Sequence, residues 1–185
     1  IMLSIEGLQS CCKTQSGKER AVVFAALIAE IAPLWTINTP QRMAMFVAQA
    51  LHESGEFRWL AELGNDKYLS KYDTGSLAKR LGNTPEADGD GQKYKGRRIF
   101  QTTGRYNYEI TGKALQLDLI NKPELLEVPR HAVSSACFYW HKNRLNRFAD
   151  TGQITACSRA INGGDNGLDD RKEYYARAKL ALGIA

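Results

Sequence analysis

The sequence predicts a mainly helical protein, and three features of the chain carry that prediction. Apolar residues recur at the three- and four-residue spacing of a helix over most of its length. Several of these stretches begin at a capping residue or a proline, or end at a glycine. No regular alternation of strands and helices is visible, which disfavours a parallel sheet. With 185 residues, 43% of them hydrophobic, we expect a single domain over residues 1–185.

The first part of the chain predicts two helices. Helical spacing of apolar residues indicates one over residues 18–33. Thr39-Pro40 is typical of a helix start, because threonine caps free backbone N–H groups and proline suits the first turn. The helix from residue 40 is apolar along most of its length and is expected to end near Gly55. Glu53 would then lie in the last turn of a buried helix.

Glycines interrupt the periodicity between residues 55 and 103. Within this stretch, the polar run over residues 83–92 predicts a surface loop. Asp88 and Asp90 alternate with glycine there, but the twelve-residue pattern of a calcium loop is absent. Aromatic and β-branched residues favour a short β-hairpin around residues 93–102.

Helical spacing returns after residue 104. The expected helices cover residues 105–116, 122–127, 130–143, 153–161 and 169–182. Pro123 and Pro129 mark two starts, and Gly163-Gly164 mark a stop.

The net charge of the chain indicates which kinds of molecule it could bind, and its cysteines indicate whether it binds metal or forms disulfides. The net charge of +5 favours polyanions, including nucleic acid, anionic membranes and acidic peptidoglycan. The four cysteines lack the spacing of metal ligands, so we expect no metal and no cofactor. The even number of cysteines is compatible with disulfides, although reduced, partly buried thiols are favoured. Residues 21–35 are too short to span a bilayer and lack a cleavage site, so we expect neither a signal peptide nor membrane insertion.

Two glutamates carry the chemical hypothesis. The apolar neighbours Phe57 and Trp59 are expected to shield Glu53 from water, which suits a general acid. Glu62 follows nine residues later, beyond the break at Gly55, and is expected to face Glu53 across a cleft. Such a pair hydrolyses glycosidic bonds, with inversion at a gap of about 6.5–9.5 Å and retention at about 5–5.5 Å. 

The same stretch resembles the start of a zinc-protease HExxH motif. Glu56 stands where the second histidine is required, which disfavours a metal site.

Polar and aromatic side chains elsewhere suit a sugar chain, whose hydroxyls need hydrogen bonds and whose ring faces stack on aromatic rings. They gather in residues 94–108, a mixture that also fits single-stranded nucleic acid. Around Asn162, two glycines allow a ligand to approach the backbone closely. The expected substrate-binding residues are His52, Tyr94, Gln101, Tyr106, Asn107, Asn162 and Arg171.

Together these stretches resemble glycoside hydrolase family 19, which contains plant chitinases and phage and pyocin-type lysins. The resemblance covers about residues 40–182. It implies a mainly α, two-lobed lysozyme-like helical domain with a short β-hairpin beside the cleft, and an inverting mechanism. His52-Glu53-Ser54-Gly55 matches the family segment that contains the proton donor, and Glu62 matches the base that activates water.

The resemblance also implies roles for residues later in the chain. Gln101 and Thr103 match a Gln-x-Ser/Thr segment whose hydroxyl holds the attacking water, which makes Thr103 a third catalytic residue. Tyr106-Asn107 match a pair that lines the groove. Asn162 matches an Asn-Gly-Gly motif, and Arg171 matches an arginine near the acid.

Two positions depart from the family pattern. Arg98 replaces the second glycine of Gly-Arg-Gly, and Thr102 stands where an aliphatic residue is common. Because a glycine there allows a positive φ or close packing, we expect Arg98 to affect the level of activity more than the fold.

The resemblance is closest to the bacteriolytic branch, the phage or pyocin-type endolysins. We therefore expect a monomer that hydrolyses β-1,4 bonds between N-acetylated sugars of peptidoglycan and binds no nucleic acid. It would be made in the bacterial cytoplasm and act on the wall in the periplasm. The alternatives are a chitinase acting on chitin oligomers, a lytic transglycosylase, a non-catalytic wall binder and a nucleic-acid binder.

Overall fold

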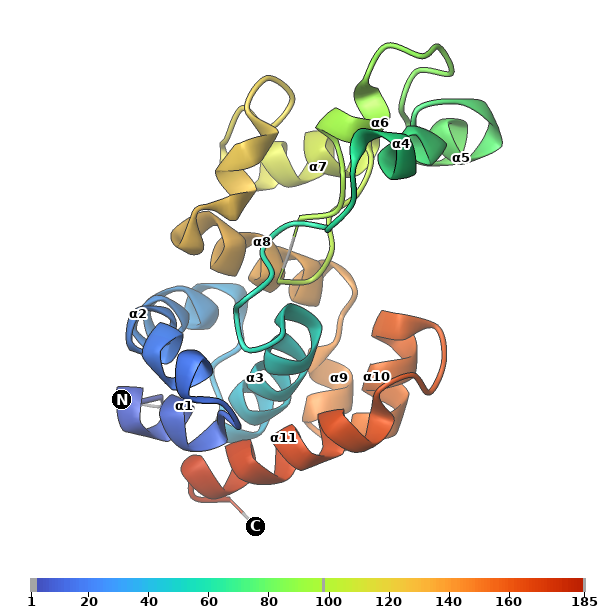
Figure 1. Cartoon of the computed structure of the whole chain (residues 1–185). Coiled ribbons are helices and arrows are strands. Elements are labelled where there is room, and N and C mark those ends of the chain that lie inside the picture. Colours follow the sequence, from blue (N-terminus) through green and yellow to red (C-terminus); the bar gives the residue numbers. More distant parts are fainter. Residues whose placement is uncertain (1–2, 98, 185) are drawn as a thin grey trace. The chain divides into compact units, whose positions relative to one another are not determined.

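The computed structural model describes residues 3–97 and 99–184, and the chain forms two compact units (Figure 1). Unit 1 combines Ile1–Arg58 with Ala136–Ala185, and unit 2 is the continuous segment Trp59–Ser135. The predicted mainly helical fold is confirmed, since the described residues form helices and only isolated β-bridges.

Unit 1 is built around one helix, α3, with α11 packed against it and α1 packed on both α2 and α11 (Figure 1). Its helices are α1 (Ile5–Cys11), α2 (Gln15–Ile31), η1 (Ala32–Trp35), α3 (Pro40–Ser54), α9 (Asn146–Ala149), α10 (Ile154–Asn162) and α11 (Leu168–Ala181). Every side chain of α3 from Met43 to Leu51 is fully buried. A helix that is apolar on nearly all sides belongs in the middle of a unit, so the sequence of α3 determines its central place.

The ends of α3 agree with the sequence prediction. The Thr39 hydroxyl accepts a hydrogen bond from the Arg42 N–H at 3.2 Å, and Pro40 is the first helical residue. Gly55 ends the helix with a φ of 58°. The next residues, Glu56 and Phe57, also have positive φ values of 58° and 64°. Each costs about 1–2 kcal/mol in an L-residue, so this left-handed turn needs support from its surroundings.

Hydrogen bonds and packing supply that support. The Glu56 carboxylate is buried and accepts hydrogen bonds from the Lys13 N–H at 2.7 Å, the Thr14 hydroxyl at 2.6 Å and the Tyr174 hydroxyl at 2.7 Å. The Phe57 ring stacks on Phe24 with centroids 4.3 Å apart. The turn after Glu53 is therefore tied to the junction of α1 and α2 and to α11.

Unit 2 has shorter elements: α4 (Asp66–Leu69), η2 (Ser70–Tyr72), α5 (Gly75–Arg80), α6 (Asp90–Lys93), α7 (Arg105–Leu115) and η3 (Pro123–Glu127). Helix α8 (Pro129–Lys142) begins in unit 2 and ends in unit 1. A buried cluster of Tyr94, Tyr108, Leu119 and Leu126 forms the core of unit 2. Arg97 is buried beside it and donates to Glu127 at 2.9 Å and to the Tyr108 hydroxyl at 2.8 Å.

The hairpin predicted around residues 93–102 is reduced to isolated bridges. Arg97 and Thr102 exchange two backbone hydrogen bonds of 3.0 and 2.8 Å, and Ala61 pairs with Arg97 on the other side. Lys93 belongs to α6, and Ile99 and Phe100 are buried side chains. The described residues of this stretch form no ladder beyond these bridges.

The polar run over residues 83–92 is also only partly the surface loop that the sequence predicted. Helix α6 begins at Asp90, and Asn83 and Asp90 are buried. The Asp73 carboxylate accepts hydrogen bonds from the N–H groups of Gly89 and Gly91, both at 3.1 Å. A buried partner outside the run thus organises it, and spacing within the run gave no sign of that partner.

Two other findings concern the chain as a whole. All four cysteines lie within the described residues, each buried and without a disulfide partner. None of the described helices has the combination of length and apolar composition that a membrane crossing needs.

Candidate active site

In unit 1, Glu53 lies in the last turn of α3 with its side chain 20% exposed. Arg171 of α11 donates from Nη2 to the Glu53 Oε1 at 2.5 Å, and its own side chain is only 1% exposed. The Phe57 ring, which the sequence suggested would shield Glu53, stacks on Phe24 instead. The partner of the carboxyl group within this unit is a buried guanidinium, as the resemblance implied for Arg171.

A chain of hydrogen bonds holds that guanidinium in place. Arg171 donates from Nη1 to the Gln49 Oε1 at 2.6 Å, and the Gln49 amide donates to the Ser158 hydroxyl at 3.0 Å. Ser158 in turn donates to the Ile154 carbonyl at 2.7 Å. Because each donor has an acceptor, the orientation of the buried amide is determined, and its oxygen faces the arginine. Sequence reasoning missed Gln49 and Ser158.

His52 precedes the acid and is held by a second set of contacts. Its Nδ1 shares a hydrogen bond of 2.6 Å with the Asp170 carboxylate, which also accepts from Lys13 at 2.6 Å. Gly167, with a φ of 69°, lies directly against the imidazole, where an added Cβ would come within 2.3 Å of Cε1. Glycine is therefore required at residue 167 both for its backbone conformation and for its contact with His52.

Asn162 ends α10 and is exposed, followed by Gly163 in a left-handed conformation with a φ of 80°. Asn162 is therefore accessible to a ligand. Its part in substrate binding stays a prediction.

In unit 2, Glu62 is held by two donors from different segments. The Tyr72 hydroxyl donates to Oε1 at 2.9 Å, and the Gly96 N–H donates to Oε2 at 3.2 Å. The Glu62 N–H donates back to the Gly96 carbonyl at 2.6 Å. The carboxylate is oriented by these bonds and remains partly exposed.

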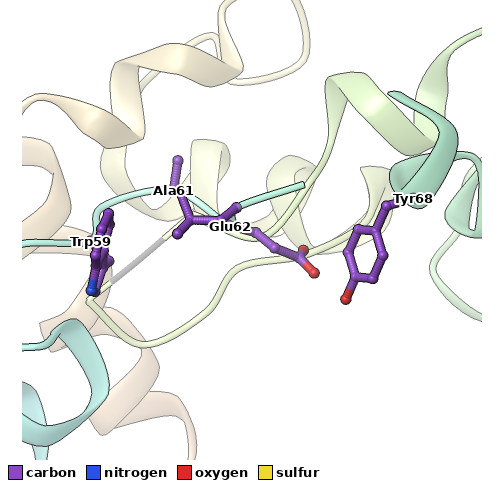
Figure 2. Close-up of a pocket in the computed structure, with 5 residues that line it drawn as sticks. Trp59, Ala61, Glu62 and Tyr68 are labelled. Carbon is purple, nitrogen blue, oxygen red and sulfur yellow. The ribbon is translucent and has the colours of Figure 1, made fainter. Parts of the chain in front are cut away.

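Glu62 also lines an open pocket of about 260 Å³ with Trp59, Ala61, Leu63 and Tyr68. Figure 2 shows the Glu62 carboxylate directed toward the Tyr68 ring. Trp59 is 37% exposed and Tyr68 is 46% exposed. Partly exposed aromatic rings beside an acid suit the apolar face of a sugar. Sequence reasoning placed Trp59 beside Glu53 and gave Tyr68 no role in binding, although the positions of both rings flanking Glu62 were an available signal.

The segment after Gly96 brings three more candidates together. An added Cβ on Gly96 would lie 2.3 Å from the Gln101 Nε2, so the Gln101 amide packs directly on this glycine. The same amide donates to the Thr103 hydroxyl at 3.0 Å, and Asn107 donates to the Thr103 carbonyl at 2.8 Å. Through Gly96, the structure therefore clusters Gln101 and Thr103 near Glu62. 

Two residues of α7 complete the candidates in this unit. Asn107 is partly exposed, and Tyr106, 57% exposed, is open to solvent.

Tyr94 does not fit the predicted contact with sugar. Its side chain is fully buried, packs on Tyr108 with centroids 5.3 Å apart, and donates to the Ile120 carbonyl at 2.8 Å. It belongs to the core of unit 2, because its ring and hydroxyl are both used there. Arg98, the main departure from the family pattern, lies outside the described residues.

Comparison with protein families gives a match over most of the chain. The profile of glycoside hydrolase family 19, described as chitinase class I, matches residues 36–156. A glycosyl hydrolase family 19 domain-containing protein of Haemophilus influenzae is 34% identical over 179 residues, covering 83% of this chain and 86% of that protein. An endochitinase of Arabidopsis thaliana is 32% identical over 151 residues, covering 78% of this chain. The chain spans only 49% of that plant enzyme.

Solved structures show the same fold. Chitinase C from Streptomyces griseus superposes with a TM-score of 0.71 at 19% identity, covering all of this chain and 94% of that one. A class IV chitinase from Zea mays gives a TM-score of 0.67 at 23% identity, covering 98% of this chain and 91% of that one. At such identities the likeness concerns the fold, and the family assignment comes from the sequence match. The chain belongs to glycoside hydrolase family 19 and is a chitinase-like glycoside hydrolase.

Proposed function

We propose that this chain hydrolyses β-1,4 bonds between N-acetylated sugars of bacterial peptidoglycan by an inverting acid–base mechanism. The observation that carries the proposal is the presence of two partly exposed glutamates, each held by dedicated hydrogen-bond donors. Glu53 is paired with buried Arg171, and Glu62 is held by Tyr72 and Gly96. Glycoside hydrolysis by inversion needs two such carboxyl groups in different roles.

In the proposed reaction, Glu53 protonates the bridging oxygen as the glycosidic bond breaks through an oxocarbenium-like state. Glu62 removes a proton from the incoming water, which adds to the anomeric carbon and inverts its configuration. Thr103 would help to hold that water, because its hydroxyl lies in the cluster joined to Glu62 through Gly96 and Gln101. The ion pair with Arg171 orients the acid.

One observation supports peptidoglycan as the polymer, and a second supports a sugar polymer in general. The chain carries a net charge of +5, and peptidoglycan is acidic. The pocket beside Glu62 offers the partly exposed rings of Trp59 and Tyr68, which suit the apolar faces of sugar rings. 

Chitin oligomers are the second candidate substrate. They have the same linkage and acetamido groups, and several relatives carry the name endochitinase.

Product analysis tests the proposal. Purified peptidoglycan and chitin oligomers are incubated in parallel with the wild type and with Glu53→Gln, and the fragments are identified by mass spectrometry. We expect the wild type to release wall fragments with reducing ends that have gained one water, and the variant to release almost none.

Other outcomes assign other functions. Anhydro ends would identify a lytic transglycosylase. Binding to the wall without release of fragments would identify a non-catalytic binder. Cleavage of chitin oligomers alone would establish the second candidate.

We also propose the setting of an endolysin, in which a monomer is made in the bacterial cytoplasm and reaches the wall from the periplasmic side. Expression in bacteria with and without a membrane-permeabilising partner tests this setting. Lysis only when the inner membrane is opened is the expected result, and lysis that is independent of permeabilisation would contradict it.

A further inference from the structure

A positively charged side chain lies beside the two tyrosines that surround Glu62. The Lys71 Nζ is 3.6 Å from the ring centroid of Tyr68 and 4.7 Å from that of Tyr72. Tyr68 lines the pocket that contains Glu62, and Tyr72 donates its hydroxyl to the Glu62 carboxylate at 2.9 Å. Lys71 therefore contacts both aromatic neighbours of the proposed base.

The rings that hold this cation are themselves held. Gly64 lies against the Tyr68 ring, where an added Cβ would come within 2.5 Å of Cδ1. Tyr72 is oriented by its bond to Glu62. Contact with two ring faces attracts an ammonium group and restricts its rotamers, so less freedom is lost when a ligand binds.

Lys71 carries a positive charge at neutral pH, as an exposed lysine does. Its interaction with Tyr68 raises the pKa of Lys71 above its usual value, in the direction that favours the ammonium form. Among the described residues its interactions are with the two tyrosines, and no carboxylate forms an ion pair with it. An exposed ammonium next to a sugar-sized pocket is available to an acid group on a ligand.

We propose that Lys71 is a specificity-determining residue, which binds at the Glu62 pocket the lactyl carboxylate of strands whose stem peptides have been removed. The inference rests on the proposed function and deepens it. In peptidoglycan the lactyl group of every second sugar is an amide where a stem peptide is attached and a free carboxylate where the peptide has been removed, whereas chitin has no acid group. Lys71 thus favours the acidic polymer over the neutral one although both share the same linkage.

The test compares two substrates that differ only at the lactyl group, which is a charged carboxylate in one and a neutral amide in the other. Glycan strands freed of stem peptides keep their lactyl carboxylates, and coupling these to methylamine gives neutral strands of the same length. We expect the wild type to show a higher kcat/KM on the charged strands. Lys71→Met should reduce that preference by about twofold to fivefold, the range of a partly exposed ion pair, and Lys71→Arg should retain most of it. Added salt should weaken the wild-type preference.

Lys79→Met is the matched control, because Lys79 is an exposed lysine of the same unit on α5. The control should keep the wild-type ratio between charged and neutral strands. An equal loss on both substrates in Lys71→Met would overturn the inference and leave Lys71 as a support for Tyr72.

Binding separates this inference from the proposed function. Dissociation constants for charged and neutral strands are measured with Glu53→Gln and with Glu53→Gln/Lys71→Met. A preference for charged strands that disappears with Lys71 supports the recognition even if the wild type cleaves only chitin, an outcome that would refute the proposed substrate alone. Equal affinities of Glu53→Gln for both kinds of strand would refute the role of Lys71 even if the wall is cleaved.

Discussion

Glu53 and Glu62 are held in contrasting ways. Glu53 ends a regular, fully buried helix and is paired with an arginine that is 1% exposed, itself held by Gln49. Glu62 lies outside any helix. The Gly96 N–H and the Tyr72 hydroxyl donate to its carboxylate, and its own N–H donates to the Gly96 carbonyl. Buried residues of the core of unit 1 thus hold the Glu53 carboxyl group, whereas partly exposed residues of short segments hold the Glu62 carboxyl group. We therefore expect substitutions that remove contacts around Glu53 to lower the stability of the protein. Substitutions that remove contacts around Glu62 should mainly lower its activity.

The largest expected effect comes from removing either carboxyl. Glu53→Gln and Glu62→Gln should each lower kcat by about 10²–10⁴-fold, the usual contribution of a general acid or base. Circular dichroism should stay near wild type, because glutamine retains the shape of glutamate. Thermal unfolding should stay near wild type in Glu62→Gln, whereas Glu53→Gln leaves the buried Arg171 guanidinium without its carboxylate and should lower the melting temperature. Steady-state kinetics on wall strands and chitin oligomers measure the effect. If Glu53→Gln kept full activity on the polymer that the wild type cleaves, its role as acid would be wrong.

A smaller but still large effect is expected from Gln49→Leu. This change leaves one donor of buried Arg171 and the Ser158 hydroxyl without their partner, which should cost about 2–4 kcal/mol of unfolding free energy. If Gln49 positions the acid through Arg171, kcat should fall more than KM rises, and Gln49→Glu should displace the pH–rate profile. Loss of stability with unchanged kcat and an unchanged profile would limit Gln49 to a structural role.

The Glu56 contacts predict a pH-dependent stability. Burial opposes ionisation of Glu56, but hydrogen bonds from Thr14, the Lys13 N–H and Tyr174 outweigh it, so the pKa of Glu56 lies below its usual value. A lowered pKa in the folded state gives stability that is present above the unfolded pKa of about 4.3 and is lost as the pH falls through the folded value. Glu56→Gln should therefore cost about 2 kcal/mol at pH 7.

Urea unfolding of Glu56→Gln and the wild type across the range from neutral to acidic pH checks this. The difference between the two proteins should shrink as the pH falls below about 4. A difference that stays constant into acid would show that the charge of Glu56 is not what supports the turn.

The smallest effect is expected from Tyr72→Phe. The variant loses one partly exposed hydrogen bond to Glu62, which is worth about 0.5–1.5 kcal/mol, while the ring beside Lys71 remains. We expect kcat to fall by less than about tenfold with a nearly unchanged melting temperature. A melting temperature that falls as far as in Gln49→Leu would remove the contrast between the two carboxyl groups.

Sequence reasoning found the parts of the fold whose signals are local. The start and stop of α3 followed from Thr39-Pro40 and Gly55, and α7, α8, α10 and α11 followed from helical spacing. Four-residue helices such as α4, α6 and α9 were missed, because about one turn gives no periodicity to detect.

The candidate site shows the same limit. The glutamates and Arg171 were found by their motifs, whereas Gln49 was missed because its link to Arg171 joins residues 122 apart in the chain. Tyr94 was assigned to the substrate because an aromatic residue among polar ones looks alike whether it binds sugar or fills a core. Only the packing with Tyr108 and the bond to Ile120 distinguish the two.

Unit 1 combines two segments that are far apart in the sequence, residues 1–58 and 136–185, and this has a consequence during synthesis on the ribosome. Arg171 is translated 118 residues after Glu53, which at common elongation rates is a delay of about 6–24 seconds. Until helix α11 emerges, α3 lacks the packing of α11 and Glu53 lacks its ion pair with Arg171. A nascent chain of this enzyme therefore cannot assemble the surroundings of its acid until the residues of α11 have been translated.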